Sequence, residues 1–195
     1  TWAPICSRTP EGLHLRHIGG TARVRDNGGA GPTGPNASTN AGFQYRARPD
    51  VGFGTRFVDT TAYADKDIFF GVEAAGQWNT FGFNGEYGQL TAKPGAGTPA
   101  QRADRDYQGG YFDVFWSPTG ETRNYNAADG SFGKPQIRRT LGSDGGIGHV
   151  MLGARYSYVD LSDGPAANPA SAQLGGKQQS YIRSEEHTSE LQSQR

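Results

Sequence analysis

The sequence predicts an all-β fold built from antiparallel strands, and three observations support this class. Apolar residues alternate with polar or small ones over several runs of about ten residues, which is the period of a strand with two different faces. Glycine is abundant, with 30 among 195 residues, roughly twice the ordinary frequency of about 7%. Long polar segments rich in Gly, Pro and Asn separate the runs, and loops of this length are uncommon in compact soluble domains.

Four strands follow from clear alternation. Residues 68–78 alternate a row of apolar side chains with a row of small or polar ones, and residues 81–91 repeat the pattern after two polar residues. Two polar residues between two alternating runs predict a tight hairpin. Residues 111–117 and 150–158 alternate in the same way. The side chains that we expect on the outward apolar face are Phe70, Val72, Phe83, Phe112, Val114, Leu152 and Tyr156.

Three further strands are predicted from weaker alternation, at residues 15–25, 41–48 and 56–63. Short turns at one end of the strands and long loops at the other are typical of outer-membrane barrels. We therefore expect an antiparallel transmembrane β-barrel fragment of seven or eight strands, open or imperfectly closed. The long loops are expected at residues 26–40, 92–106, 119–148 and 162–179.

Composition excludes several classes of protein. The 19 basic and 19 acidic residues give a formal net charge of 0, so no overall field favours binding to nucleic acid. The single cysteine, Cys6, excludes a disulfide scaffold and cysteine-based zinc sites. His14 and His17 have no neighbouring ligand cluster, and the sequence contains neither HExxH nor G-x-S-x-G. We therefore expect no metal, no cofactor and no enzymatic activity.

The two ends of the chain differ from the middle. Residues 1–14 contain no initiator Met and no strand pattern, so we expect an irregular segment read from within a truncated gene. The run that begins at residue 183 resembles the in-frame translation of a sequencing adapter, and we expect residues 183–195 to have no native role. The predicted barrel portion is therefore residues 15–182.

Eight short motifs occur in a fixed order across most of residues 15–164. They are YRARPD (45–50), RFVDT (56–60), FGVEAAG (70–76), GEY (85–87), QGGY (108–111), TGETRNY (119–125), GSFG (130–133) and GARYSYVDL (153–161). Their order and spacing resemble the phosphate-selective porin O/P family of Gram-negative bacteria.

The resemblance implies a sixteen-stranded barrel in the outer membrane, usually a homotrimer, that conducts phosphate or polyphosphate through a lumen lined by arginine and lysine. About seven strands cannot close such a barrel, so we expect a central-to-late fragment of a porin. Its expected partners are phosphate or polyphosphate anions and outer-membrane lipid.

Five arginines are candidates for the anion pathway. Arg23 and Arg25 share one face of their predicted strand, Arg46 and Arg48 share a face of theirs, and Arg155 stands on the non-apolar side. If the apolar faces meet lipid, these guanidiniums point into the lumen. A guanidinium stays charged and offers bidentate donors to phosphate oxygens, so a ladder of arginines would supply several weak anion sites.

Two alternatives stay open on the residues alone. The arginines could instead pair with acidic neighbours and only solvate the sheet. The runner-up function is a non-transporting antiparallel β-sheet module that binds an anionic ligand on its arginine-bearing face, and packing of the apolar side chains against a second sheet would favour it. The acidic neighbours are Glu73, Glu86 and Asp113, and the loop cations that could contact anions at the mouth are Arg123, Lys134, Arg138 and Arg139.

Overall fold

The computed structural model describes the strands and part of their connections. The described residues are 5–9, 12–27, 42–48, 56, 58–60, 64–94, 103–126, 131–135, 137, 146–163 and 175–188, with residues 5–16 and 188 described by their backbone only. Every regular element among them is a β-strand. Within this part of the chain, no helix is long and apolar enough to cross a membrane.

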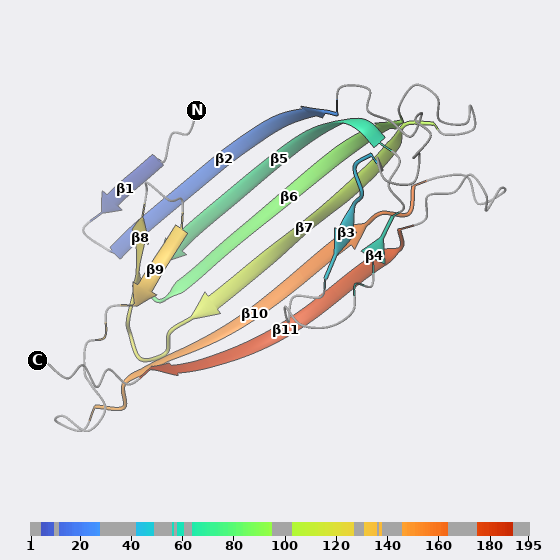
Figure 1. Ribbon diagram of the computed structural model, residues 1–195. Helices are drawn as coiled ribbons and strands as arrows, with labels where there is room; N and C mark the ends of the chain where they lie inside the picture. Colours follow the sequence, from blue (N-terminus) through green and yellow to red (C-terminus); the bar gives the residue numbers. More distant parts are fainter. Residues whose placement is uncertain are drawn as a thin grey trace, which may run out of the picture.

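Seven strands form one antiparallel sheet, which confirms the predicted fold class. In spatial order they are β1 (Ile5–Thr9), β2 (Gly12–Asp26), β5 (Ala64–Trp78), β6 (Phe81–Pro94), β7 (Arg105–Trp116), β10 (His149–Asp160) and β11 (Lys177–Thr188). The sheet is a single curved layer, with β1 and β11 at its two edges (Figure 1). It is an open barrel fragment rather than a closed barrel.

Four short strands form two further sheets that are separate from the main sheet, the expected wall of the barrel. β3 (Arg46–Ala47) pairs with β4 (Val58–Asp59), and β8 (Arg123–Asn126) pairs with β9 (Ser131–Pro135). Our prediction of wall strands at residues 41–48 and 56–63 is therefore wrong. The alternation there reflects burial of Tyr45 and Val58 beneath a short pair of strands that packs on the main sheet.

The N-terminal residues also differ from our expectation. Residues 5–9 form β1, which pairs with β2 from Ile5↔Arg16 to Thr9↔Gly12, so residues 1–14 are not all irregular. Backbone pairing of this kind needs no alternation of side chains, which is why the sequence pattern missed it. At the other end, residues 183–188 continue β11 in register with β10. Leu191 lies outside the described residues, and the absence of a native role for residues 183–195 stays a prediction.

Long connections occur at both ends of the strands. The tight turn between β5 and β6 contains Asn79 in the left-handed region, at a φ of 49°, a conformation that Asn adopts more readily than most residues. The long segment after β7 begins at that same end, because Phe81 pairs with Trp116 and the Ser117 amide donates to the Thr80 carbonyl at 2.9 Å. Our prediction of short turns alone at one end is therefore wrong.

The main sheet has one apolar face, and its large side chains are exposed. From Ile68 to Trp78 the ten residue steps span about 33 Å of strand, and a tilt of about 40° reduces this to about 25 Å, the height of the apolar band of a transmembrane barrel. Of the seven side chains predicted here, Val114 and Leu152 are half-buried and the other five are exposed. The large exposed side chains of this apolar face are Ile18, Val24, Phe70, Val72, Trp78, Phe81, Phe83, Tyr87, Phe112, Trp116, Tyr156 and Tyr181.

Candidate anion pathway on the polar face

The opposite face of the sheet, here called the polar face, carries most of the charged side chains of β5, β6, β7 and β10 between the strand ends, whereas Arg183 and Glu185 of β11 share the parity of the apolar face. Strand register arranges them in rows across the strands. One row contains Arg25, Asp67, Ala92 and Arg105, and another contains Glu73, Glu86 and Tyr111. Between these rows lie one with Arg23, Phe69, Leu90 and Tyr107 and one with Gly71, Gly88 and Gly109. The two short strand pairs pack on this face, and their contacts leave the glycine row between them.

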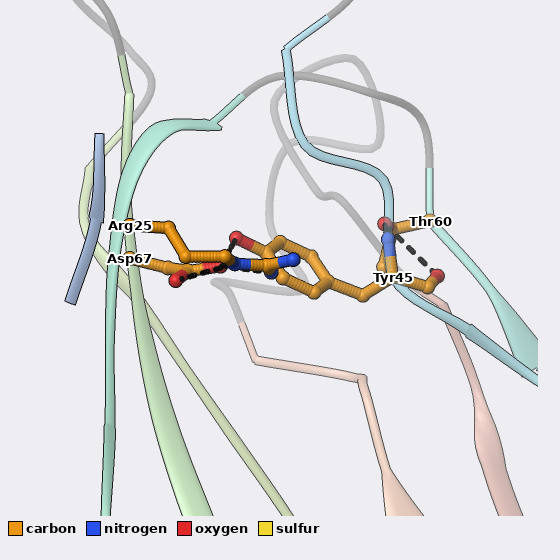
Figure 2. Close-up of polar contacts among 4 residues, drawn as sticks. All are labelled: Arg25, Tyr45, Thr60 and Asp67. Atoms are coloured by element: carbon orange, nitrogen blue, oxygen red, sulfur yellow. Dashed lines mark hydrogen bonds and ion pairs between the residues drawn. The ribbon is translucent and has the colours of Figure 1, made fainter. Parts of the chain in front are cut away.

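The β3/β4 pair is anchored on a buried carboxylate (Figure 2). Asp67 is fully buried and accepts bonds from Arg25 Nε at 3.0 Å to each oxygen, from the Arg25 terminal nitrogen, and from the Tyr45 hydroxyl at 3.0 Å. The Tyr45 amide donates to the Thr60 hydroxyl at 3.0 Å. Burial, followed by the bond to Asp67, raises the pKa of Tyr45 well above its ordinary value. The phenol therefore stays protonated and serves as a fixed donor.

An apolar cluster surrounds this anchor. Tyr45 and Tyr107 pack with ring centroids 5.3 Å apart, and Val58 and Leu161 are buried beside them. The Asp59 amide donates to the Gly175 carbonyl at 3.0 Å, which ties β4 to the segment before β11. The β3/β4 pair is thus fixed across β5, β7 and the β10–β11 connection.

The β8/β9 pair is anchored by a histidine and by aromatic rings. The His17 ring is buried, with Nε2 2.9 Å from Glu73 Oε1 and Nδ1 hydrogen-bonded to the Tyr125 hydroxyl. The ring of Phe132 packs edge-on against Phe115 at 5.2 Å. Gly82 leaves space for this arrangement, because a Cβ there would lie 2.1 Å from the Phe115 ring. The pair therefore covers the polar face near the β5–β6 turn.

Arg123 links β8, β9 and the sheet. Its Nε donates to the Gly133 carbonyl and its terminal nitrogen to the Phe132 carbonyl, both at 3.0 Å. Its guanidinium lies 5.2 Å from the Phe115 ring centroid. Burial lowers the pKa of Arg123 from its ordinary value. This loop cation, which we predicted as a possible anion contact, is committed to internal contacts.

The predicted pathway arginines have different surroundings. Arg25 pairs with Asp67, and Arg155 forms a bidentate pair with Asp113 at 2.5 and 2.7 Å. Arg23 lies 5.5 Å from the Phe69 ring centroid and forms no ion pair with a carboxylate in the described part of the chain. The pairing alternative thus holds for two of these arginines.

The remaining predicted cations lie away from the wall. Arg46 and Arg48 have exposed side chains on and beside β3, and Lys134 is exposed on β9. They therefore lie on the segments that cover the polar face. Arg138 and Arg139 lie outside the described residues.

Sequence reasoning missed Asp67 and Arg105 on the polar face, and it missed Tyr45, which packs onto this face from the segment before β3. Arg105 is 3% exposed and lies in the same row as Asp67. Alternation could have placed both residues. Asp67 and Arg105 share the parity of the polar positions on β5 and β7, but each lies before the first residue that we predicted for its strand. Among the described residues, no three His, Cys, Asp or Glu side chains gather in a group that could hold a metal ion.

The fold and the two faces define a class of protein. Strands long enough to cross a bilayer, with apolar side chains exposed on one face and charged ones on the other, form the wall of a transmembrane β-barrel. Comparison with known families matches residues 1–184 to the phosphate-selective porins O and P, and the chain belongs to this family. Its members are porins of the outer membrane.

One relative is much longer than this chain. A protein of Caulobacter vibrioides, itself uncharacterized, is 31% identical to this chain over 149 residues. The match covers 74% of this chain and 27% of that protein. The chain therefore spans about a quarter of the length of its relative.

Proposed function

We propose that this chain forms part of the wall of an anion-selective porin through which phosphate or polyphosphate diffuses passively. In this proposal the polar face lines the lumen, the apolar face meets lipid, and the complete protein assembles as a homotrimer. Membership in the family of phosphate-selective porins supports a role in an outer-membrane porin. The segregation of the two faces of the sheet supports the direction in which the side chains point.

One observation carries the proposed anion pathway. Arg23 has an exposed side chain on the polar face, and no described carboxylate pairs with its guanidinium. A guanidinium that forms no salt bridge offers a positive charge and a planar set of donors to phosphate oxygens, and the carboxylate that its charge reaches, Asp67, is itself paired with Arg25. Arg25 and Arg155 act differently, because Asp67 and Asp113 balance their charges. They fix the wall around the pathway.

The exposed apolar face weighs against the binding-module alternative. In such a module these side chains would pack against a second sheet. Phe70 and Val72 are instead 61% and 60% exposed, and the short strand pairs of the described chain pack on the polar face. An exposed apolar surface of this extent requires lipid or another cover.

Current measurements on the full-length porin that carries this sequence test the proposal. Arg23→Gln should weaken the block of chloride current by phosphate on the order of tenfold, because one charge-assisted contact is lost. Lys93→Gln is the matched control, since Lys93 lies beyond the apolar band and pairs with Asp104 at 3.9 Å. The double variant Arg46→Ala, Arg48→Ala tests the cations beside β3. Unchanged anion selectivity in both arginine variants would exclude a role for these residues in the pathway.

A further inference from the structure

An apolar cavity of about 360 Å³ lies on the polar face. Aromatic and aliphatic side chains dominate its lining, including Phe69, Tyr107, Leu90 and Tyr45. The interior of a porin is ordinarily polar, and a small hydrated anion gains nothing from an apolar wall. The volume is within the range of sites for small organic ligands, about 300–1,000 Å³. The cavity therefore points to a solute larger and less polar than orthophosphate.

Glycines make the floor of this cavity flat. Gly71, Gly88 and Gly109 are neighbours in strand register on three adjacent strands, and all three line the cavity. A Cβ on Gly88 would lie 2.6 Å from the Phe69 ring, and one on Gly71 would lie 3.0 Å from it. The glycines thus provide the space that the Phe69 ring occupies. An aromatic ring above a flat floor presents a surface against which a sugar ring can pack.

The two sides of the cavity differ in charge. On one side, Arg23 does not line the cavity itself but stands at its rim, where its guanidinium lies 5.5 Å from the ring centroid of the lining residue Phe69. On the other side, Glu73 and Glu86 are direct partners in register, and the Tyr111 hydroxyl donates to Glu86 at 2.7 Å. The row of Arg23 and that of Glu73 are four residue steps apart along the strands, about 13 Å between Cα atoms. The side chains of both rows extend over the floor, so the distance between their charged groups is shorter than the distance between the Cα atoms. The remaining gap suits a ligand with a phosphate at one end and hydroxyls at the other.

Resting on the proposed porin function, we infer that this cavity is a subsite for sugar phosphates. The phosphate binds Arg23, the sugar ring packs on Phe69 above the glycine floor, and hydroxyl groups donate to Glu73 and Glu86. Carboxylates accept hydrogen bonds from hydroxyls but repel a bare phosphate dianion. The acidic row therefore favours a phosphate ester of a hydroxylated molecule over orthophosphate.

Block of chloride current through the full-length porin in a planar bilayer tests this inference. The blockers are orthophosphate, glucose and glucose 6-phosphate. We expect glucose 6-phosphate to block at a roughly tenfold lower concentration than orthophosphate, because the ester also gains the contact with the apolar wall. Glucose alone should block weakly, since it lacks the phosphate that binds Arg23.

Variants at two adjacent positions assign the site. Phe69→Ala should remove the advantage of glucose 6-phosphate and leave the block by orthophosphate unchanged. Phe70→Ala is the matched control, because Phe70 lies on the apolar face of the same strand. Phe69→Leu keeps an apolar side chain and should lose part of the advantage, and the open-channel conductance of each variant reports whether it folds.

The outcomes separate the two proposals. Equal block by both phosphates, unaffected by Phe69→Ala, would overturn the subsite and leave the phosphate pathway standing. Block by glucose as strong as block by glucose 6-phosphate would also overturn it, because the site would then ignore the phosphate. Absence of block by either phosphate would contradict the proposed porin function itself.

Discussion

The β3/β4 and β8/β9 pairs both pack on the polar face of the main sheet, but different contacts hold them there. At β3/β4, a buried carboxylate receives three donor groups and an apolar cluster closes around Tyr45. The β8/β9 pair contacts the sheet through the edge-on packing of Phe132 against Phe115 and through the hydrogen bond of Tyr125 with His17. The Asp59 amide also donates to the Gly175 carbonyl in the segment before β11, which adds a backbone hydrogen bond to the contacts of the β3/β4 pair.

This difference predicts unequal local stability. A segment with buried apolar contacts and backbone hydrogen bonds opens rarely, whereas one held by side chains opens more often. We therefore expect β3/β4 to be a fixed constriction of the lumen and β8/β9 to be the more easily displaced cover. Amide hydrogen exchange of the full-length porin in detergent measures both openings in one experiment.

The largest effect is expected for Asp67→Ala, which removes the centre of the β3/β4 anchor. Arg25 and the Tyr45 hydroxyl would both lose their acceptor, at a cost of about 3 kcal/mol. This is the low end for a buried pair, because Arg25 is 38% exposed. Exchange of residues 42–48 should then become roughly a hundredfold faster.

Asp59→Ala is the control for this variant. Asp59 is exposed and accepts one bond from Gln44 at 2.7 Å, so its loss should change the free energy of opening by less than about 0.5 kcal/mol. Wild-type exchange in Asp67→Ala would show that the apolar cluster alone holds the β3/β4 pair.

A smaller effect, about 2 kcal/mol, is expected for Arg123→Ala on the β8/β9 pair. The change removes two hydrogen bonds to carbonyl oxygens and the contact of the guanidinium with Phe115. Exchange of residues 131–135 should accelerate while that of residues 42–48 stays constant. Equal acceleration in both segments would contradict the independence of the two pairs. Lys134→Ala, an exposed change on β9, is the control.

Alternation in the sequence predicted five strands of the main sheet, β2, β5, β6, β7 and β10, but it missed the two edge strands β1 and β11 and the short strand pairs that cover the polar face. A period of two assigns Phe70 to the apolar face and Arg23, Arg25 and Arg155 to the other, because successive side chains of any strand point to opposite faces. Which of these arginines is balanced depends on partners 42 residues away, Asp67 for Arg25 and Asp113 for Arg155. Strand register decides those pairs, and a long connection between β2 and β5 leaves the register open in the sequence.

Local alternation could not predict the position of the β3/β4 and β8/β9 pairs for another reason. Tyr45 lies in a segment that alternation assigned to a weak strand, and Phe132 lies in one that was assigned to a long loop, yet both pack on a sheet formed by residues distant in the chain. Burial by a folded-back loop leaves the same apolar positions as burial in a wall. Only the placement of the segment distinguishes the two, and that placement is a tertiary property.

A change of about 1 to 2 kcal/mol is expected for Tyr125→Phe. The substitution removes the hydrogen bond between the Tyr125 hydroxyl and Nδ1 of His17, in a ring that is 3% exposed, and the loss of one partner of a buried hydrogen bond costs about 1–3 kcal/mol. Exchange of residues 123–126 reports the change. His17→Phe in the same protein tests the origin of the cost. If Tyr125→Phe destabilises the double variant as much as the wild type, the effect does not come from the histidine.

The smallest effect at neutral pH, about 1 kcal/mol, is expected for Tyr45→Phe, which loses one hydrogen bond to Asp67.

The difference in stability between wild type and Tyr45→Phe should change at alkaline pH. The pKa of Tyr45 is raised above the ordinary value of 10.0 when β3/β4 is docked, so the undocked phenol ionises first. Stability from this group is complete below pH 10 and falls as the pH rises through the raised pKa. The wild-type pair should therefore loosen above about pH 10, whereas the Phe variant should keep its neutral-pH stability there. The difference in tyrosinate absorbance between the two proteins measures the ionisation of Tyr45 directly. Ionisation of this tyrosine at or below pH 10 would show that its hydroxyl is not held in the buried contact with Asp67.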